Sequence, residues 1–294
     1  MNMLMGIYLG DIEENICGLA DSIVNYAIDI AKTMLTYNPQ KFAEESGVWT
    51  TITNINNKII PIASALLALF FFIGFCENCI DVKEELNFEL CLKLFIRIGI
   101  AEYFVVNSID IVLSLFSFTT NLAGLSTNEI VRYDFVTDVT PYISDCSNAE
   151  RLGLLLLIPI LFIIAIGTAA VIIITVLIRF FKIWIAVPYG TLAFSTISSG
   201  SHWLNGTVSA FIKYLLSVLL EAFSMGIGLS IGLKFAIKGS ANSIFKIVEF
   251  NSEGYGNFQT VLLNITYSAI SLMIIMMLLR TSQKIAGKVL ALDR

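Results

Sequence analysis

The sequence predicts an all-α membrane protein: a polytopic helix bundle with about five transmembrane helices and an amphipathic N-terminal helix. The first observation is a run of 27 uncharged residues between Arg151 and Arg179. A helix rises about 1.5 Å per residue, so about 20 apolar residues cross a hydrocarbon core about 30 Å thick. The second observation is the composition, which is 56% hydrophobic and 14% charged, whereas soluble domains carry about 25% charged residues. The two observations together leave no room for a large soluble catalytic domain.

Residues 1–58 precede the first predicted span and are expected to form an amphipathic extracytoplasmic region. Its apolar residues recur at alternating spacings of four and three: Ile12, Ile16, Leu19, Ile23, Tyr26 and Ile30. Such spacing is typical of one face of an amphipathic helix, and the Asn38-Pro39 pair is expected to end it. The pattern favours a helix on the bilayer surface or against the bundle over a self-association seam, because no charge pairing flanks the stripe.

Five apolar runs are long enough to cross a membrane, and together they define a bundle over residues 59–279. The runs are 59–76, 94–118, 152–177, 211–233 and 261–279. The connections 119–151, 188–205 and 236–259 are predicted to be loops.

The distribution of basic residues predicts the orientation in the membrane. The C-terminal tail, residues 280–294, carries Arg280, Lys284, Lys288 and Arg294 against Asp293 alone. Basic residues near span ends favour the cytoplasmic side. The tail is therefore expected in the cytoplasm, and an odd number of spans then places the N-terminus outside the plasma membrane.

Polar side chains inside the predicted spans are the first candidates for function. Each costs about 2.5–3.5 kcal/mol at a helix centre and needs a partner or water. The candidates for a conduit or for polar contacts between helices are Arg97, Glu102, Asn107, Asp110, Lys213 and Glu221. Asn107 and Asp110 share a helix face, which is consistent either with a hydrated lumen or proton relay or with a structural contact to another span. Glu221 lies about two turns from Lys213, too far for direct pairing, and needs another partner.

A ladder of small residues follows Glu221 in the fourth span. Ser224, Gly228 and Gly232 are spaced by four residues, the pattern that allows two membrane helices to approach closely. We interpret the ladder as a helix-packing surface.

The sequence predicts no catalytic, cofactor or metal site, and we expect no enzyme. It contains none of the glycine-rich nucleotide motifs and no nucleophile elbow. His202 is the only histidine and has no acidic neighbour that would favour a metal. The net charge of −5 makes stable binding of duplex DNA unfavourable, because phosphate contacts need clustered Lys and Arg.

The order of several segments is recognisable as that of a known family. The first span opens with Ile59-Ile60-Pro61-Ile62-Ala63, and an Asn-x-x-Asp-Ile-Val pattern occupies 107–112. The third span exits through Arg179 and Lys182 toward Ala193-Phe194-Ser195-Thr196, a few residues before Trp203. With these segments the chain resembles the TrbL-type polytopic components of conjugative type IV secretion systems, particularly the short forms on Gram-positive integrative conjugative elements.

The resemblance implies a non-enzymatic channel-base or scaffold subunit that forms a homo-oligomeric ring in the plasma membrane. Such a subunit would assist the passage of single-stranded DNA with its relaxase, and its partners would be lipid and other secretion subunits, including ATPases and a cell-wall hydrolase. Members usually carry Gln where this chain has Glu221 and have more prolines before Phe194. A small-solute transporter or permease subunit is the main alternative, although no internal repeat supports it. A purely structural scaffold acting through the outer loop is another.

Overall fold

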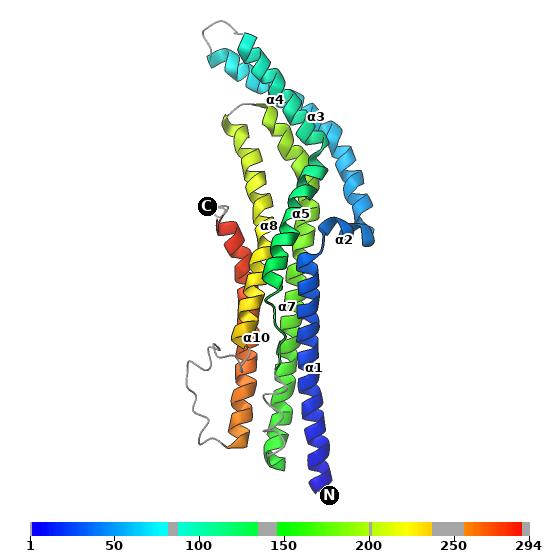
Figure 1. Ribbon diagram of the computed structural model, residues 1–294, viewed down its shortest axis with the longest axis vertical. Helices are drawn as coiled ribbons and strands as arrows, with labels where there is room; N and C mark the ends of the chain where they lie inside the picture. The colour runs from blue at the N-terminus through cyan, green and yellow to red at the C-terminus, as the bar shows by residue number, and fades with distance from the viewer. Residues whose placement is uncertain (1, 82–87, 135–145, 200–201, 237–255, 290–294) are drawn as a thin grey trace. The chain divides into compact units, whose positions relative to one another are not determined.

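The computed structural model describes residues 2–81, 88–134, 146–199, 202–236 and 256–289. Every element in these ranges is helical (Figure 1): α1 (Asn2–Thr36), α2 (Pro39–Glu45), α3 (Val48–Asp81), α4 (Phe88–Val106), α5 (Ser108–Thr127), α7 (Asn148–Ser195), η1 (Thr196–Ser199), α8 (His202–Ala236) and α10 (Asn257–Val289). Five stretches are long and apolar enough to cross a membrane: Val48–Cys76, Ser108–Thr127, Ala149–Ser199, Gly206–Ala236 and Phe258–Lys288. The predicted class, an all-α membrane helix protein with about five spans, is confirmed.

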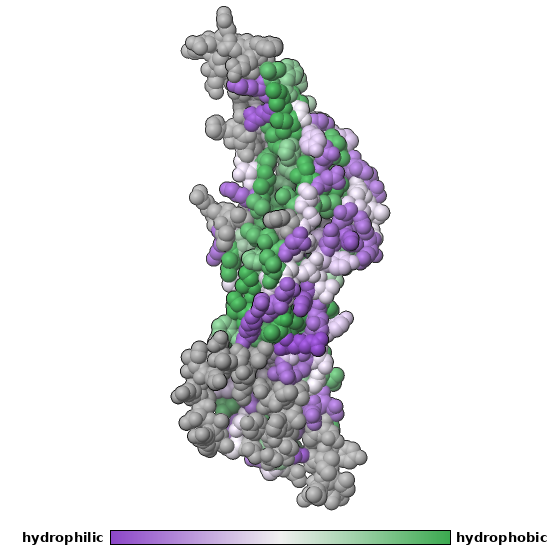
Figure 2. Space-filling view, viewed as in Figure 1, coloured by the Kyte–Doolittle hydropathy of each residue, from purple (hydrophilic) through white to green (hydrophobic). Residues whose placement is uncertain are grey.

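Large apolar side chains lie on the outside of these helices, as expected for a protein in lipid. Phe72, Leu156 and Met277 are each more than 60% exposed, and the face drawn in Figure 2 carries broad hydrophobic areas. A soluble monomer rarely exposes contiguous apolar surface on this scale. Residues 135–145, 237–255 and 290–294, which belong to two predicted loops and to the end of the basic tail, lie outside the described residues.

The second span differs from the prediction, which placed one helix over 94–118. The structure divides this run at Asn107 into α4 and α5. The interruption is local, because the Asn107 backbone N–H still donates to the Tyr103 carbonyl and the Ile111 N–H to the Asn107 carbonyl, both at 3.1 Å. The Asn107 side chain donates to the same Tyr103 carbonyl at 2.9 Å. Asp110 then lies in the first turn of α5, where its charge complements the helix dipole. The span in this part of the chain is therefore Ser108–Thr127.

The third span is longer than predicted, and much of the predicted inner loop is helix. α7 contains 48 residues and continues through Arg179, Lys182 and Pro188 to Ser195, after which η1 follows. The prediction ended this helix at 177 because charges follow there. The helix continues because Phe180, Ile183 and Val187 carry its apolar pattern onward, and all three are fully buried. At about 1.5 Å per residue, α7 exceeds the length that one crossing needs.

The described contacts divide the chain into two compact units. Unit 1 comprises Met1–Thr36, Ala123–Leu177 and Phe223–Lys284, and unit 2 comprises Tyr37–Leu122, Ile178–Ala222 and Ile285–Arg294. Both α7 and α8 contribute residues to each unit.

In unit 1, α1 buries a different face from the one that the apolar stripe predicts. Three residues of the stripe, Ile12, Leu19 and Tyr26, are 46–68% exposed. The buried face instead carries mostly small residues, two acidic ones and the larger Ile28 and Leu35: Glu13, Cys17, Ala20, Asp21, Val24, Ala27, Ile28, Ala31 and Leu35. Small side chains let helix backbones approach closely, whereas a large apolar stripe suits lipid. The stripe therefore marks the outward face of α1 within this unit.

In unit 2, α2 packs on the C-terminal part of α7. Asn38 caps α2 by accepting a hydrogen bond from the Gln40 backbone N–H at 2.8 Å. Phe42 stacks on Trp184 with ring centroids 5.6 Å apart, and the Trp184 indole N–H donates to the Pro39 carbonyl at 3.2 Å. Gly47 makes the turn into α3 with φ of +73°, a conformation that favours glycine.

Candidate functional site

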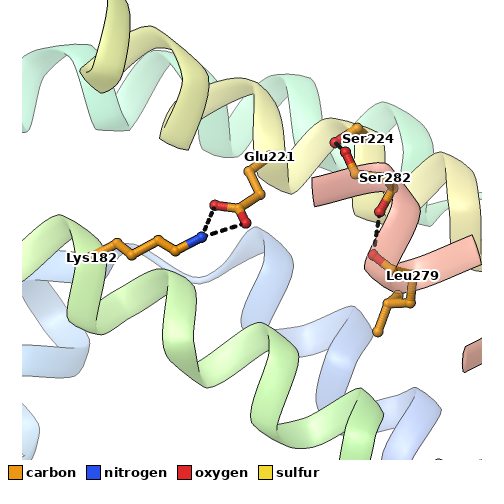
Figure 3. A network of polar contacts seen from close by, with 5 residues as sticks. All are labelled: Lys182, Glu221, Ser224, Leu279 and Ser282. Carbon is orange, nitrogen blue, oxygen red and sulfur yellow. Dashed lines mark hydrogen bonds and ion pairs between the residues drawn. The ribbon is translucent and has the colours of Figure 1, made fainter. Parts of the chain in front are cut away.

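An ion pair with a buried carboxylate joins α7 to α8 within unit 2 (Figure 3). Lys182 Nζ donates to both carboxylate oxygens of Glu221, at 2.7 and 3.1 Å. The Glu221 side chain is 4% exposed and that of Lys182 is 36% exposed. A carboxylate removed from water needs such a partner, because desolvation of an unpaired charge is costly. The partner that Glu221 needs is thus Lys182 on α7. Lys213, on the same helix as Glu221, is not needed as its partner.

Arg179 adds a second positive charge to this pair. It lies one turn before Lys182 on α7 and is completely buried. Its charge interacts with that of Glu221, and its guanidinium carbon lies 5.8 Å from the centroid of the Phe180 ring. One carboxylate therefore balances two cations, so loss of Glu221 would affect both α7 side chains.

A second polar cluster connects α3, α5 and α7 within unit 2. The Thr191 hydroxyl donates to Asn56 Oδ1 at 2.6 Å, and Ser108 Oγ lies 2.6 Å from Thr191 Oγ1. A hydroxyl has one proton to donate, so the Ser108 hydroxyl donates to Thr191. All three residues are buried. The chain of bonds connects the three helices, although Asn56 Nδ2 is buried with no hydrogen-bond partner among the described residues.

Two hydrogen bonds join the short helix η1 to α3 and α4 within unit 2. Ser198 Oγ donates to the Leu67 carbonyl of α3 at 2.8 Å, and Arg97 Nε of α4 donates to the Ile197 carbonyl at 2.9 Å. Gly74 of α3 lies so close to η1 that a Cβ atom there would overlap the Ser199 carbonyl. η1, which directly follows α7, is therefore a packed part of unit 2.

Arg97 and Lys213, two of the predicted candidates, line one cavity of about 410 Å³ in unit 2. Its lining is Arg97, Ile197, Val208, Ser209, Ile212 and Lys213. The cavity thus combines two cations and a hydroxyl with aliphatic walls.

The other predicted candidates do not join this cavity. Glu102 accepts a hydrogen bond from Ser64 of α3 at 3.1 Å, which is a contact between helices. Asn107 bonds to its own helix and Asp110 is exposed, so neither pairs with another candidate. Among the described residues no group of three or more His, Cys, Asp or Glu side chains could hold a metal ion.

The small-residue ladder packs on α10 of the same chain, within unit 1. Ser224 Oγ donates to the Ser282 carbonyl at 3.0 Å (Figure 3). A Cβ atom at Gly228 would lie 3.4 Å from the Leu278 carbonyl oxygen, and one at Gly232 would lie 3.2 Å from Ile275 Cγ1. The face of the ladder is therefore occupied by α10, and a contact between copies of the chain would need another surface.

We expect Gly228→Leu to destabilise unit 1 by about 1–2 kcal/mol or more, because a large side chain there would force α8 away from α10. Gly167→Leu is the matched control, since nothing lies within 4 Å of a Cβ atom at Gly167. Thermal unfolding of the two purified variants in one detergent measures the difference. Equal midpoints for the two variants would show that the ladder does not pack against α10.

Glu13 is a buried acid on α1, which is not among the five candidate spans. Its side chain is fully buried, and neither carboxylate oxygen has a hydrogen-bond partner among the described residues. Burial raises the pKa of Glu13 from 4.5 to about 7, and the charge of Arg151 acts in the opposite direction. Glu13 is therefore largely protonated in the folded protein at mildly acidic pH.

The raised pKa of Glu13 predicts a pH dependence of stability. In the unfolded chain the group loses its proton near pH 4.5, so the folded state is favoured at low pH and loses stability as pH rises toward about 7. Glu13→Gln removes this titration. We expect the thermal midpoint of the parent, measured from pH 5 to pH 8, to fall more than that of the variant. Parallel curves would contradict the raised pKa.

The comparisons with known proteins agree with the resemblance seen in the sequence. A family model described as TrbL/VirB6 plasmid conjugal transfer like protein matches residues 23–191, more than half of the 294 residues. The chain belongs to this family. No curated protein and no solved structure matches it significantly.

The region that matches the TrbL/VirB6 family contains some of the candidate residues and ends before the others. Residues 23–191 include Arg97, Lys182 and the polar cluster around Thr191, whereas Lys213, Glu221 and the ladder follow the matched region. The family is a structural membrane component of conjugal transfer systems, and five helices of this chain can span a membrane. The chain is therefore a multi-pass membrane component of such a system.

The sequence pattern did not identify Arg179 and Lys182 as partners of Glu221. Both were predicted to lie at the cytoplasmic end of the third span, because basic residues commonly follow the end of a membrane span. The available signal was the apolar pattern that resumes after Lys182, at Ile183 and Trp184. A helix that continues past a charge places that charge within the bundle, where it needs a partner.

Proposed function

We propose that this chain is a channel-base subunit of a conjugative type IV secretion system. It assembles as a homo-oligomeric ring in the plasma membrane and helps single-stranded DNA, with its attached relaxase, to cross. The single observation that carries the proposal is the family match over residues 23–191. The role is non-enzymatic, and separate ATPases supply the energy. Other secretion subunits and a cell-wall hydrolase are its partners.

The contacts inside unit 2 support a structural role for most of the polar residues. Glu221, Glu102 and Thr191 each form a contact with another helix of the same chain. Groups that satisfy one another in this way stabilise a bundle. A water-filled path for DNA would then form between copies of the chain, which is consistent with a ring.

Deletion of the coding sequence from the conjugative element tests the proposal. We expect conjugation frequency to fall to background while the relaxase still nicks its DNA site, because transport is lost and DNA processing is not. Expression of the parent chain from a second locus should restore transfer. Undiminished transfer by the deletion strain would overturn the proposal, and loss of nicking would assign the chain to DNA processing.

The proposed orientation places the N-terminus outside and the C-terminus in the cytoplasm. Cys146 is buried and is a poor reporter, so we choose the exposed Asn128, in the predicted outer connection. In a cysteine-free background, an impermeant thiol reagent is expected to label Asn128→Cys in intact cells. A cysteine added after Arg294 should be labelled only after lysis. The reverse pattern would show the inverted orientation.

A further inference from the structure

The cavity between α4, η1 and α8 is built for an anionic, amphiphilic ligand. Its polar groups are Arg97, Ser209 and Lys213, and its other walls are aliphatic. None of the six lining residues is acidic. The nearest acids along the same helices have other contacts, because Glu102 bonds to Ser64 and Glu221 to Lys182. Among the lining residues that the structure describes, the cavity therefore carries two cations and no carboxylate.

The two basic groups and the hydroxyl line the same cavity, so one anion there can contact all three. The bond from Arg97 Nε to the Ile197 carbonyl fixes the orientation of the guanidinium at the cavity wall. Ser209 and Lys213 are four residues apart on α8, so they share a helix face. A planar guanidinium and a flexible ammonium are the groups that bind phosphate oxygens in proteins.

The aliphatic walls favour a lipid over a nucleic acid as the source of the phosphate. Proteins that hold single-stranded DNA stack its bases on aromatic side chains, and none of the six described lining residues is aromatic. Ile197, Val208 and Ile212 instead suit a glycerol and acyl chain. Lys213 also lies within two turns of the start of the candidate span Gly206–Ala236. In a membrane this position is close to the level of the lipid headgroups. Basic pockets between membrane helices bind anionic headgroups in this way.

We propose that the cavity lined by Arg97, Ser209 and Lys213 binds the phosphate headgroup of an anionic phospholipid, with the aliphatic wall of α8 and η1 against its glycerol and acyl region. The bound lipid links α4 to α8 through η1. The lipid would thereby stabilise the turn between the third and fourth spans.

Thermal unfolding of the purified full-length chain in detergent tests the proposal, with phosphatidylglycerol, phosphatidylcholine, inorganic phosphate or a single-stranded oligonucleotide added. We expect phosphatidylglycerol to raise the midpoint and the other three to leave it unchanged. Lys213→Gln should weaken the apparent affinity for phosphatidylglycerol about fivefold, since one basic group contributes on the order of 1 kcal/mol. Lys58→Gln, an exposed lysine on α3, is the matched control and should bind like the parent.

Arg97→Gln is a second variant, and its effect on phosphatidylglycerol binding should match that of Lys213→Gln. Equal binding by the parent and both cavity variants would overturn the proposal. A Lys213-dependent response to inorganic phosphate as strong as that to phosphatidylglycerol would also overturn it, as evidence for a free-phosphate site. A Lys213-dependent response to the oligonucleotide alone would overturn the lipid assignment and leave the proposed transport role standing. None of these results depends on conjugation frequency.

Discussion

Lys182→Met is expected to destabilise the protein by about 3 kcal/mol, because it leaves the Glu221 carboxylate buried without its hydrogen-bonding cation. Removing one partner of a buried ion pair costs about 3–5 kcal/mol. The lower end applies here because the Lys182 side chain is 36% exposed and because Arg179 still interacts with Glu221. Glu221→Leu should cost at least as much, since it leaves two cations without their carboxylate. Thermal or chemical unfolding at matched detergent concentration measures both.

The double variant Lys182→Met/Glu221→Leu is the sharpest control for the ion pair. Replacing both members by apolar residues of similar size removes the desolvation cost of the pair together with its attraction, so only the lost interaction between Glu221 and Arg179 remains. The double variant should therefore be more stable than the sum of the single effects predicts. Strict additivity of the two effects would show that the side chains do not interact.

Glu221→Gln separates charge from hydrogen bonding at the same site. The amide keeps an oxygen acceptor for Lys182, so we expect transfer close to that of the parent, whereas Glu221→Leu impairs it. Conjugation frequency at matched membrane abundance is the measurement. Normal transfer by the Leu variant together with failure of the Gln variant would show that ionisation itself matters, which would favour the transporter alternative.

Gly74→Ala is expected to have the second large effect. A methyl group at Gly74 would overlap the backbone carbonyl of Ser199, and backbone cannot rotate away as a flexible side chain can. α3 and η1 would have to separate, at a cost of about 1–3 kcal/mol or more, as for overpacked cores. The lowered unfolding midpoint of the purified variant measures this cost.

Gly99→Ala is the matched control for Gly74→Ala, because it lies on α4 in the same unit and nothing lies within 4 Å of a Cβ atom there. Alanine is the better helix former by about 1 kcal/mol, so the control should be neutral or stabilising. Equal effects of the two substitutions would contradict the close approach of α3 to η1.

The helical membrane class could be predicted because the run between Arg151 and Arg179 decides it without any tertiary information. The face that α1 buries could not be predicted from the sequence. Periodicity identifies which side of a helix is apolar, but lipid and protein compete for that side, and small residues such as Ala20 and Ala27 pack closely against protein. The end of α7 could not be predicted for the same reason, because it depends on the burial of Phe180 and Trp184 by other segments of the chain.

For the candidate site, the sequence identified polar residues and not their partners. Glu221 was recognisable because an acid inside an apolar run needs compensation, but Lys182 lies 39 residues earlier, on another helix. Arg97 and Lys213 were recognised separately, and only the fold brings them to one cavity. Asn107 and Asp110 were expected on one continuous helix, and the break at Asn107 gives them local roles instead.

Photocrosslinking of the transferring strand in mating cells tests the proposed DNA conduit most directly. Photoreactive nucleotides in the transferred strand would be activated during mating, and DNA bound covalently to the immunopurified chain would be measured. If the chain forms the conduit, transferred-strand DNA is recovered with it, and this DNA disappears when the relaxase or the coupling ATPase is inactivated. Absence of that DNA from this chain, while another membrane subunit from the same cells yields it, would contradict a role in the conduit.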